Sequence, residues 1–449
     1  MPPDPVARPP SIDSLLAFAW DSAEFTATDA MAVVRLTRST TIDAIDTLVR
    51  LGLLQELPNA RETGDYRKGR PARRFELRAD AGVLVGVDAG PQHITVTVAD
   101  LRSRPLLTQR AMLDPDHAVV ADRRDAIGAT VDAALEAAGR GRAEVLAICA
   151  GVAAPVNARG ISPSHRNGFW RQTNPGLAEL FAAWTPVVRI ENDASLAAIA
   201  EGSVGAAVGC GNYVTLLAGA RLGAGVVVDG RVLRGAHGGV GEMVAFDHVA
   251  GVGSPIGLGH RAEQWAREAI ESKEVAPGGA LASMPADRID GQAVLELARD
   301  GDADACRIVE RLGRTLARIV SVLGSMFDPE RVIVCGAISA GVVDVVAAAR
   351  RALPTDLDLP APQILASRLG ADIVVRGAVA AAAEDARSTV LDRWMTAVPA
   401  GEPRPNGPGA LEMVRRHARW DVPPFEMVED PGIEPGKAPQ VRIPRGGPA

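Results

Sequence analysis

The most informative segment of this chain is residues 187–242, VVRIENDASLAAIAEGSVGAAVGCGNYVTLLAGARLGAGVVVDGRVLRGAHGGVGE. A short apolar strand over the first four residues ends at three polar residues, Glu191, Asn192 and Asp193. Apolar residues then recur at helical spacing over 194–202, so the polar triplet stands where a strand passes into a helix. A carboxylate at the carboxyl end of a strand is typical of the ligand crevice of an α/β sheet.

Two β-branched segments follow, at 213–217 and 226–229, with a glycine-rich stretch between them. Gly219, Gly223 and Gly225 lack side chains, which lets backbone N–H groups approach a phosphate or another ligand. This pattern predicts a strand hairpin whose turn lines the same crevice. A structural alternative fits the spacing equally well: a buried strand end with an Asp at the helix N-cap, followed by an ordinary hairpin.

The composition indicates a soluble globular protein. The 449 residues suffice for two or three domains, with 47% hydrophobic and 23% charged residues. A formal net charge of −7 argues against nucleic-acid binding over the whole surface, but it allows a local basic surface. No run approaches the roughly 18 apolar residues of a membrane span. Residues 1–10 are Pro-rich and lack a signal-peptide core, so we expect a disordered start and a cytoplasmic protein.

The cysteines argue against a disulfide framework. They lie far apart in the sequence and none has the CxxC spacing; they are Cys149, Cys210, Cys306 and Cys335. Buried free thiols in a reducing cytoplasm are therefore expected.

Residues 11–80 are predicted to form a winged helix-turn-helix DNA-binding domain. Three short helices are expected, at 11–19, at 27–34 after the N-cap pattern Thr26-x-x-Asp29, and from residue 38 to about residue 51. A recognition helix places base- and phosphate-contacting side chains at its exposed amino end. In the third helix these candidates are Arg38, Ser39, Thr40 and Thr41.

A basic segment lies between two expected wing strands at 53–57 and 75–77. Over residues 67–74 five of eight residues are basic and none is acidic; the basic residues are Arg67, Lys68, Arg70, Arg73 and Arg74. Gly-Arg-Pro within this segment is extended and narrow, which suits a minor groove in which arginine responds to shape and potential. A charge run is usually a solvated face, but its place after three helices and between wing strands favours DNA binding.

A different fold begins at residues 84–90, LVGVDAG. An apolar strand ends in Asp88-x-Gly90, and a second strand is expected at 94–99. The hairpin resembles the one with which actin-like sugar kinases approach ATP phosphates and magnesium. The later loop 162–170 is rich in polar groups, and its Asn167 is a candidate ligand of an effector.

Taken together, the segments resemble the ROK family of repressors, open reading frames and sugar kinases. They occur in family order: GVDAG at 86–90, GVAAPV at 151–156, ENDA at 191–194, GARLGAG at 219–225, LRGAHGGVGE at 233–242, DPERVIVCGAIS at 328–339 and LGADIVVRGAVAAA at 369–382. The resemblance covers roughly residues 11–384. The N-terminal winged helix, with its KGRPAR hinge at 68–73, resembles that of the family's repressor branch. The resemblance implies an α/β fold in which a winged helix-turn-helix precedes a two-lobed actin/hexokinase-like domain at 81–390. It also implies a homodimer that binds a sugar between its lobes, while 391–449 are expected to form a Pro/Gly-rich extension.

The resemblance assigns roles to several residues. In the family's kinases the position of Asp193 takes a proton from a sugar hydroxyl, and Asn192 and Glu242 match sugar-binding positions. The second phosphate loop departs from Gly-Thr-Gly-Ile-Gly-x-Gly, because Ala220 replaces the threonine and Arg221 replaces a glycine. In the first loop Asp88 and Gly90 are followed by Pro91 and Gln92 instead of Gly-Thr. Both loops therefore look degenerate, and we expect kinase activity to be absent.

This sequence also lacks the residues that form the zinc cluster of the family. Ala245 stands where the family's histidine should be, and residues 246–262 contain no cysteine. His248 and His260 without thiolates are a poor zinc set, so no metal and no cofactor are expected. The sugar-contacting histidine is lost as well; His237 or His260 could replace it, although a surface or packing role fits each better.

Three functional hypotheses remain. The preferred one is a DNA-binding transcriptional regulator, a repressor whose clamp binds a carbohydrate effector and whose partner is double-stranded operator DNA. The alternative is an ATP-dependent, glucokinase-like sugar kinase with an N-terminal regulatory domain, which the retained Asp88, Asp193 and Glu242 favour. The third is a repressor that no longer binds a sugar and responds to another ligand.

Overall fold

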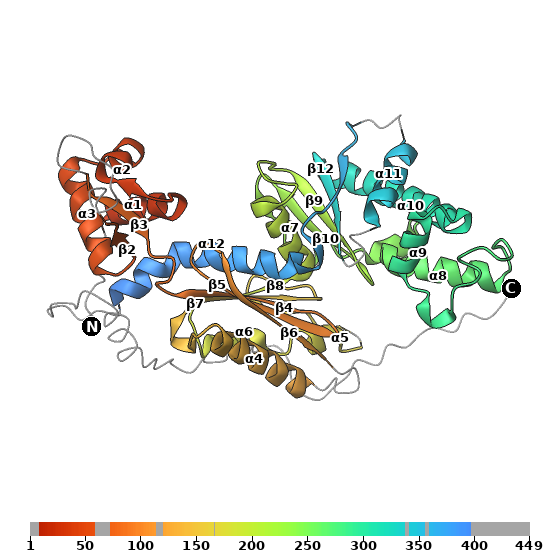
Figure 1. The fold of residues 1–449 in the computed structure, drawn as a ribbon, viewed down its shortest axis with the longest axis horizontal. Helices are drawn as coiled ribbons and strands as arrows, with labels where there is room; N and C mark the ends of the chain where they lie inside the picture. Colours follow the sequence, from red (N-terminus) through yellow and green to blue (C-terminus); the bar gives the residue numbers. More distant parts are fainter. Residues whose placement is uncertain are drawn as a thin grey trace, which may run out of the picture.

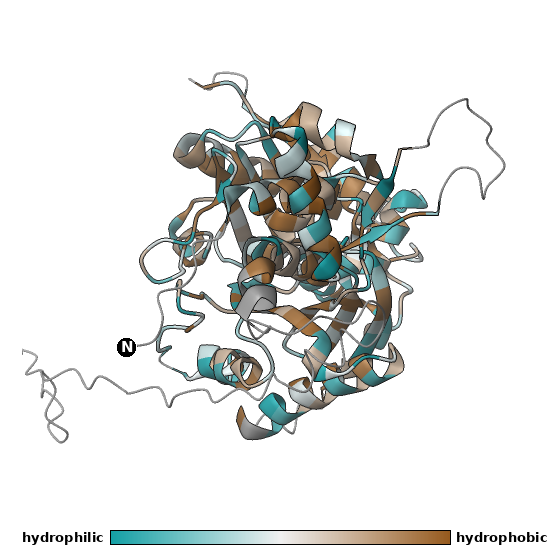
Figure 2. Ribbon diagram, turned by 90° about the vertical axis from the view of Figure 1, so that its left-hand side faces the viewer, coloured by the Kyte–Doolittle hydropathy of each residue, from teal (hydrophilic) through white to brown (hydrophobic). Residues whose placement is uncertain are grey.

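The structure is a computed structural model that describes residues 9–58, 72–113, 120–165, 167–336, 341–354 and 359–396. Three sheets organise these residues, one of three strands and two of five. In Figure 1 a small N-terminal unit lies at one end of the molecule, two α/β lobes make up the rest, and the long helix α12 connects them. Figure 2 shows hydrophobic and hydrophilic residues on different sides of many of the helices, as expected where one side faces a core.

The N-terminal unit has three helices and a three-stranded sheet of order β1-β3-β2. Its elements are α1 (Pro10–Asp21), β1 (Phe25–Thr26), α2 (Ala27–Val34), α3 (Arg38–Arg50), β2 (Leu54–Glu56) and β3 (Arg74–Leu77). Thr26 and Asp29 form the predicted cap as a reciprocal capping box. The wing strands β2 and β3 pair antiparallel, while β1 was not predicted and adds a third strand beside β3. Residues 59–71, which include Arg67, Lys68 and Arg70 of the basic segment, lie outside the described residues.

The first lobe contains a sheet of order β6-β5-β4-β7-β8. Its first three strands are antiparallel neighbours, and β7 and β8 continue parallel to β4. The strands are β4 (Val83–Ala89), β5 (His93–Ala99), β6 (Pro105–Met112), β7 (Val145–Val152) and β8 (Val188–Asn192). Helices α4 (Val120–Ala137) and α6 (Leu177–Ala182) lie on one side of this sheet and α12 on the other (Figure 1).

The second lobe repeats the topology of the first, with strand order β11-β10-β9-β12-β13. Again an antiparallel trio is followed by two parallel strands. The elements are α7 (Asp193–Val204), β9 (Tyr213–Ala218), β10 (Leu222–Val228), β11 (Arg231–Val232), α8 (Leu258–Glu271), α9 (Gly291–Arg299), α10 (Ala303–Phe327), β12 (Arg331–Cys335), α11 (Val342–Ala352) and β13 (Gln363–Ala366). The duplicated topology agrees with the predicted two-lobed α/β fold.

Helix α12 (Ile373–Thr396) joins the N-terminal unit to the first lobe. One continuous core contains Leu16 of α1, Leu84 of β4 and Leu391 of α12. The helix passes residue 390, the predicted end of the sugar-kinase-like domain. The domain boundaries at 80/81 and 390 remain predictions. Of the extension expected at 391–449, residues 391–396 belong to α12, and residues 397–449 lie outside the described residues.

The four cysteines are free thiols that differ in how deeply they are buried. Cys149 and Cys335 are buried, Cys210 is partly buried and Cys306 is exposed, so the prediction of buried thiols is wrong for Cys306. Burial raises the pKa of the Cys149 thiol well above its ordinary range, which keeps it protonated and unreactive. Within the described ranges, no helix is both long and apolar enough to cross a membrane.

Candidate functional site

Asn192 is the N-cap of α7, at the junction of strand and helix that the sequence predicted. Its Oδ1 accepts the backbone N–H groups of Ala194 (2.9 Å) and Ser195 (3.1 Å). Its side-chain amide donates to the carbonyl oxygen of Ala154 at 3.2 Å. One amide hydrogen is therefore left for a ligand, and the main role of this side chain is to fix the start of α7.

Asp193 begins α7 and is half-buried. Burial raises the pKa of its carboxyl to about 7, and the negative charges of Asp88 and Glu242 act in the same direction. A hydrogen bond from the N–H of Ala194, at 2.8 Å, acts against this rise. A carboxylate with a pKa near neutrality is suited to accept a proton as a general base.

Glu242 is held beside β10 by a loop in which three glycines have positive φ. These are Gly235 (φ 74°), Gly238 (φ 76°) and Gly241 (φ 89°). A Cβ on Gly238 would lie 2.1 Å from the carbonyl oxygen of Val156, and one on Gly241 only 1.8 Å from that of Ala224. Only glycine permits this approach. As a result Glu242 forms a β-bridge with Gly223 of the second loop.

The surroundings of Glu242 include a residue that the sequence analysis treated only as part of a polar loop. Glu242 is exposed, but partial desolvation of its carboxyl raises its pKa, and the positive charges of Arg221 and His165 oppose the rise. The ring of His165 lies 4.5 Å from that of Trp170, centroid to centroid, and its Nδ1 contacts Oδ1 of Asn167. Asn167 is exposed and also accepts the N–H of Phe169 at 3.2 Å. Glu242 is thus coupled electrostatically to Asp193 and to His165, and His165 in turn contacts Asn167.

The first phosphate loop is covered by an imidazole. Nε2 of His93 lies 3.1 Å from Oδ2 of Asp88, and a Cβ on Gly90 would lie 2.3 Å from Cε1 of His93. On α4, Arg123 donates to the carbonyl oxygens of Ala89 (2.8 Å) and Gly90 (2.9 Å). The backbone that a phosphate would approach at Gly90 is therefore occupied. The sequence analysis missed His93, although it follows the Asp-x-Gly pattern by three residues.

The second loop is occupied by residues 255–257. Leu222 donates its N–H to the carbonyl of Pro255 (2.8 Å), and Gly257 donates to the carbonyl of Ala220 (3.0 Å). Arg221 is exposed and its backbone bridges Ile256.

The glycines of this loop differ in their surroundings. A Cβ on Gly225 would lie 2.1 Å from the carbonyl oxygen of Ala194, and one on Gly223 would lie 3.3 Å from Cβ of Ala194. These two glycines are explained by packing against α7, whereas Gly219 has open space around it.

Among the described residues, no three His, Cys, Asp or Glu side chains gather as a metal site. His237 is exposed, and His248 ends a short 3-10 helix that contains Ala245. Nδ1 of His260 lies 3.7 Å from a carboxylate oxygen of Glu263.

The amino end of α3 exposes only part of the predicted DNA-contacting set. Arg38 and Ser39 are exposed, and Thr40 is partly exposed beside the N-cap Thr37. Thr41 is 1% exposed, and its hydroxyl donates to the carbonyl of Thr37 at 2.9 Å. The expectation of an outward-facing side chain is therefore wrong for Thr41, because helical spacing places it on the buried face of α3.

The two described arginines of the basic segment are already paired. Arg73 forms two hydrogen bonds with the carboxylate of Glu56, at 2.9 and 2.7 Å, and Arg74 lies 3.1 Å from that of Glu24. Arg35, which the sequence analysis missed, ends α2 in the left-handed conformation (φ 58°) and is exposed. Its guanidinium and that of Arg38 form no ion pair with another described residue. Arg35 and Arg38 flank the turn between α2 and α3.

Comparison with known proteins identifies relatives of two kinds. A model of the ROK family matches residues 84–385. The DNA-binding transcriptional dual regulator NagC of Escherichia coli K12 is 24% identical over 304 residues, which cover 65% of this chain and 71% of NagC. A glucokinase of Streptomyces coelicolor is 29% identical over 273 residues, covering 58% of this chain and 83% of the enzyme.

Solved structures are similar as well. A ROK family transcriptional regulator, a homologue of the E. coli MLC protein, matches 86% of this chain and 99% of its own with a TM-score of 0.65 and 20% identity. A ROK glucokinase of Streptomyces griseus, in complex with glucose and AMPPNP, matches 68% of this chain and all of its own with a TM-score of 0.53 and 27% identity. The first similarity extends beyond the lobes, and with the family match it confirms the predicted fold class.

Proposed function

The chain belongs to the ROK family, and from this premise we propose that it is a DNA-binding transcriptional regulator that acts as a repressor. The observation that carries the proposal is the N-terminal unit, in which α2 and α3 form a helix-turn-helix beside a three-stranded wing. Arg35, Arg38 and Ser39 are exposed around its turn, where a recognition helix meets DNA. The protein would act in the cytoplasm as a homodimer on double-stranded operator DNA.

The effector would be a carbohydrate or a related molecule bound between the lobes. Asp193 and Glu242 would accept hydrogen bonds from its hydroxyl groups, and Asn192 would contribute its remaining amide hydrogen. Asn167 and His165 would complete the site from the first lobe. Such a ligand changes DNA binding only if its affinity differs between two conformations. Helix α12, which contacts the first sheet, α7 and α1, supplies a physical connection between the lobes and the N-terminal unit.

The test is a salt titration of DNA binding by the full-length protein on a fragment of its own upstream DNA. Arg38→Ala should weaken specific binding and reduce the magnitude of the salt slope by about one. The control, Arg288→Ala, removes an exposed arginine of the second lobe and should bind as the unchanged protein does. A further double variant, Arg67→Ala with Lys68→Ala, tests the part of the basic segment outside the described residues. The proposal would be contradicted if the unchanged protein and all variants bound any DNA equally weakly.

A second candidate function is an ATP-dependent sugar kinase with a regulatory N-terminal domain. The pKa of about 7 at Asp193 and the similarity to glucokinases favour it. The imidazole over Gly90 and the exposed Arg221 in the second loop count against it. A coupled assay of ATP turnover over a panel of sugars separates the two functions. Sugar-dependent turnover that disappears in Asp193→Asn would establish the kinase.

A further inference from the structure

A cavity lies near the carboxyl end of α7, away from Asp193. It has a volume of about 1020 Å³ and is lined by the loop at 157–160, β8, the C-terminal half of α7, the segment around β11 and one side of α12. None of the proposed effector ligands lines it. Its volume corresponds to the upper end of the range for small-molecule sites, about 300–1,000 Å³. The cavity is therefore large enough for a metabolite and separate from the proposed effector site.

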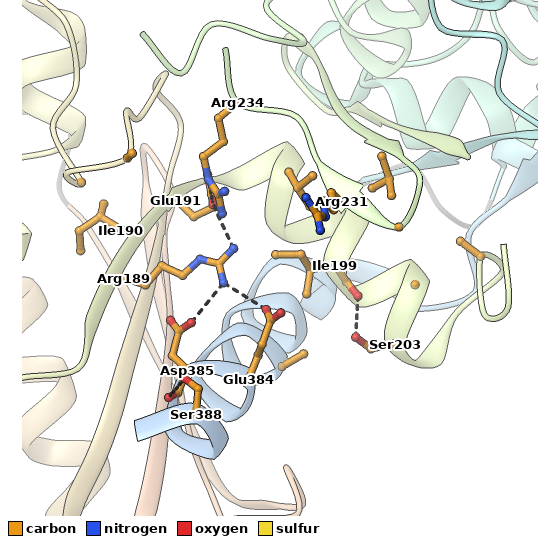
Figure 3. A pocket seen from close by; sticks show the side chains of 18 of the residues that line it. Arg189, Ile190, Glu191, Ile199, Ser203, Arg231, Arg234, Glu384, Asp385 and Ser388 are labelled. Carbon is orange, nitrogen blue, oxygen red and sulfur yellow. Dashed lines mark hydrogen bonds and ion pairs between the residues drawn. The ribbon is translucent and has the colours of Figure 1, made fainter. Parts of the chain in front are cut away.

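The lining of this cavity is strongly charged. It contains four arginines and three carboxylates: Arg159, Arg189, Arg231, Arg234, Glu191, Glu384 and Asp385. Most of them form one network on the wall of the cavity, part of which Figure 3 draws. The buried carboxylate of Glu191 lies 3.3 Å from Arg189 and 2.6 Å from Arg234. On its other side, Arg189 lies 3.4 Å from Glu384 and 3.6 Å from Asp385 of α12.

Arg231 stands outside this network. Its side chain is exposed, and its guanidinium makes no hydrogen bond or ion pair with another residue that the structure describes. Figure 3 shows it bordering the same cavity as Arg189 and Arg234. The guanidinium of Arg159 is likewise without a partner among the described residues. The seven charged side chains of the lining carry a net charge of about +1, and within the described part of the chain the guanidiniums of Arg159 and Arg231 are the two without a carboxylate partner.

We propose that this cavity binds a phosphate-bearing metabolite of about hexose size, with its phosphate between Arg231 and the pair Arg189 and Arg234. A guanidinium presents donors in a planar fork that matches phosphate oxygens, and such charge-assisted bonds are about twice as strong as neutral ones. The hydroxyl groups of Ser203 and Ser388, which donate to backbone carbonyls at 2.8 and 2.9 Å, retain lone pairs for the hydroxyl groups of the ligand. A neutral sugar would leave Arg231 unpaired.

Binding would also change the ion pairs of α12. A phosphate competes with Glu384 and Asp385 for Arg189, and these carboxylates lie two or three residues before Arg387, which contacts α1. The ligand would therefore act on the part of α12 that holds the N-terminal unit. An effect on operator binding rests on the proposed function, whereas occupancy of the cavity does not.

Calorimetry on the full chain tests the proposal with glucose 6-phosphate, inorganic phosphate and glucose as probes. Glucose 6-phosphate should bind, Arg231→Ala should weaken it at least about tenfold, which corresponds to about 1.4 kcal/mol, and Arg288→Ala should leave it unchanged. Tighter binding of glucose 6-phosphate than of inorganic phosphate identifies a sugar phosphate as the ligand, and equal binding identifies free phosphate.

A second variant, Ser203→Trp, fills the cavity from the exposed face of α7 and should also abolish binding. The melting temperature of each variant shows whether it is folded. The proposal is overturned if neither phosphate probe binds the unchanged protein with a Kd below about 10 mM, which corresponds to about 2.7 kcal/mol. Equal binding by Arg231→Ala and Arg288→Ala would overturn it as well, because the phosphate would then sit elsewhere.

Discussion

Arg387 of α12 forms a bidentate ion pair with Asp21, the last residue of α1, at 2.9 Å (Nη1–Oδ1) and 2.6 Å (Nη2–Oδ2). Its Nη2 also donates to the carbonyl oxygen of Ala17 at 3.0 Å. At the same helix end Arg102, from the turn between β5 and β6, donates to the carbonyls of Trp20 (3.2 Å) and Ser22 (2.6 Å). Cations at a helix C-terminus also interact favourably with its dipole. Two arginines from separate elements therefore fix α1 to the first lobe.

The first prediction concerns this attachment. Arg387→Ala should increase hydrogen–deuterium exchange in residues 10–21 more than in the lobes, because it removes the ion pair and the bond to Ala17. The pair is partly exposed, with 38% of the Arg387 and 66% of the Asp21 side chain accessible, so the loss should be no more than about 1 kcal/mol. Asp21→Ala should have a similar effect, and the double variant should add little to it. Additive effects of the two substitutions would show that the pair is not coupled.

The second prediction concerns Asp193 and pH. Its folded-state pKa of about 7 lies above the ordinary value of 3.8, so the unfolded chain loses this proton first. Stability should therefore fall as the pH rises from about 4 to about 7, by at most about 4 kcal/mol at about 1.4 kcal/mol per unit. Asp193→Asn removes this loss and should raise the melting temperature at about pH 8 more than at about pH 5. An equal gain at both pH values would refute the raised pKa.

The third prediction concerns His93, whose substitution should destabilise the protein, whereas that of Asp193 should stabilise it. The hydrogen bond that His93 donates to the Asp88 carboxylate raises the pKa of His93 above 6.5, so its stabilising effect is fully present below pH 6.5 and is lost as the pH rises through the folded-state pKa. His93→Gln should thus lower the melting temperature more at about pH 5.5 than at about pH 9. Asp88→Asn should abolish this pH dependence, since it removes the carboxylate. A melting difference independent of pH would contradict the ion pair.

The fourth prediction compares two glycines near the candidate effector site. Gly241→Ala should destabilise the protein by more than about 2 kcal/mol, because φ is +89° and the new Cβ would lie 1.8 Å from the carbonyl oxygen of Ala224. Gly219→Ala should change stability by less than about 1 kcal/mol, because its Cβ would meet nothing within 4 Å. Chemical denaturation measures both. Comparable losses would mean that the loop around Gly241 relaxes.

Local patterns predicted much of the fold. The capping box at Thr26 and Asp29, the α3 helix and the strand-to-helix junction at Asn192 follow from sequence spacing, because each depends on residues within four positions. The inward direction of Thr41 was also available from the sequence, since it lies three and four residues before the buried Ala44 and Ile45. Its place at the exposed start of the helix indicated the opposite direction, and the helical spacing was the stronger signal.

Contacts between distant residues could not be predicted in the same way. Arg73 meets Glu56 and Arg74 meets Glu24, across 17 and 50 positions, so the sequence showed basic residues without their partners. The charged cavity collects residues from 157 to 388, and no local pattern marks it. Function depends on such pairings, because a paired arginine and a free one present different charge to a ligand.

The last prediction follows from the pair between Arg73 and Glu56. The bidentate bond from Arg73 lowers the pKa of Glu56, so the carboxylate stays ionised and neutralises Arg73 on the wing. Arg73 also lies 3.5 Å from Asp46. If the proposed function is correct, Glu56→Gln should remove the nearer of these two neutralising charges, tighten DNA binding and steepen its salt dependence by up to about one unit. The control Asp287→Asn removes an exposed charge in the second lobe and should change neither quantity. Fluorescence anisotropy at several salt concentrations measures both, and unchanged binding of Glu56→Gln would show that Arg73 does not contact DNA.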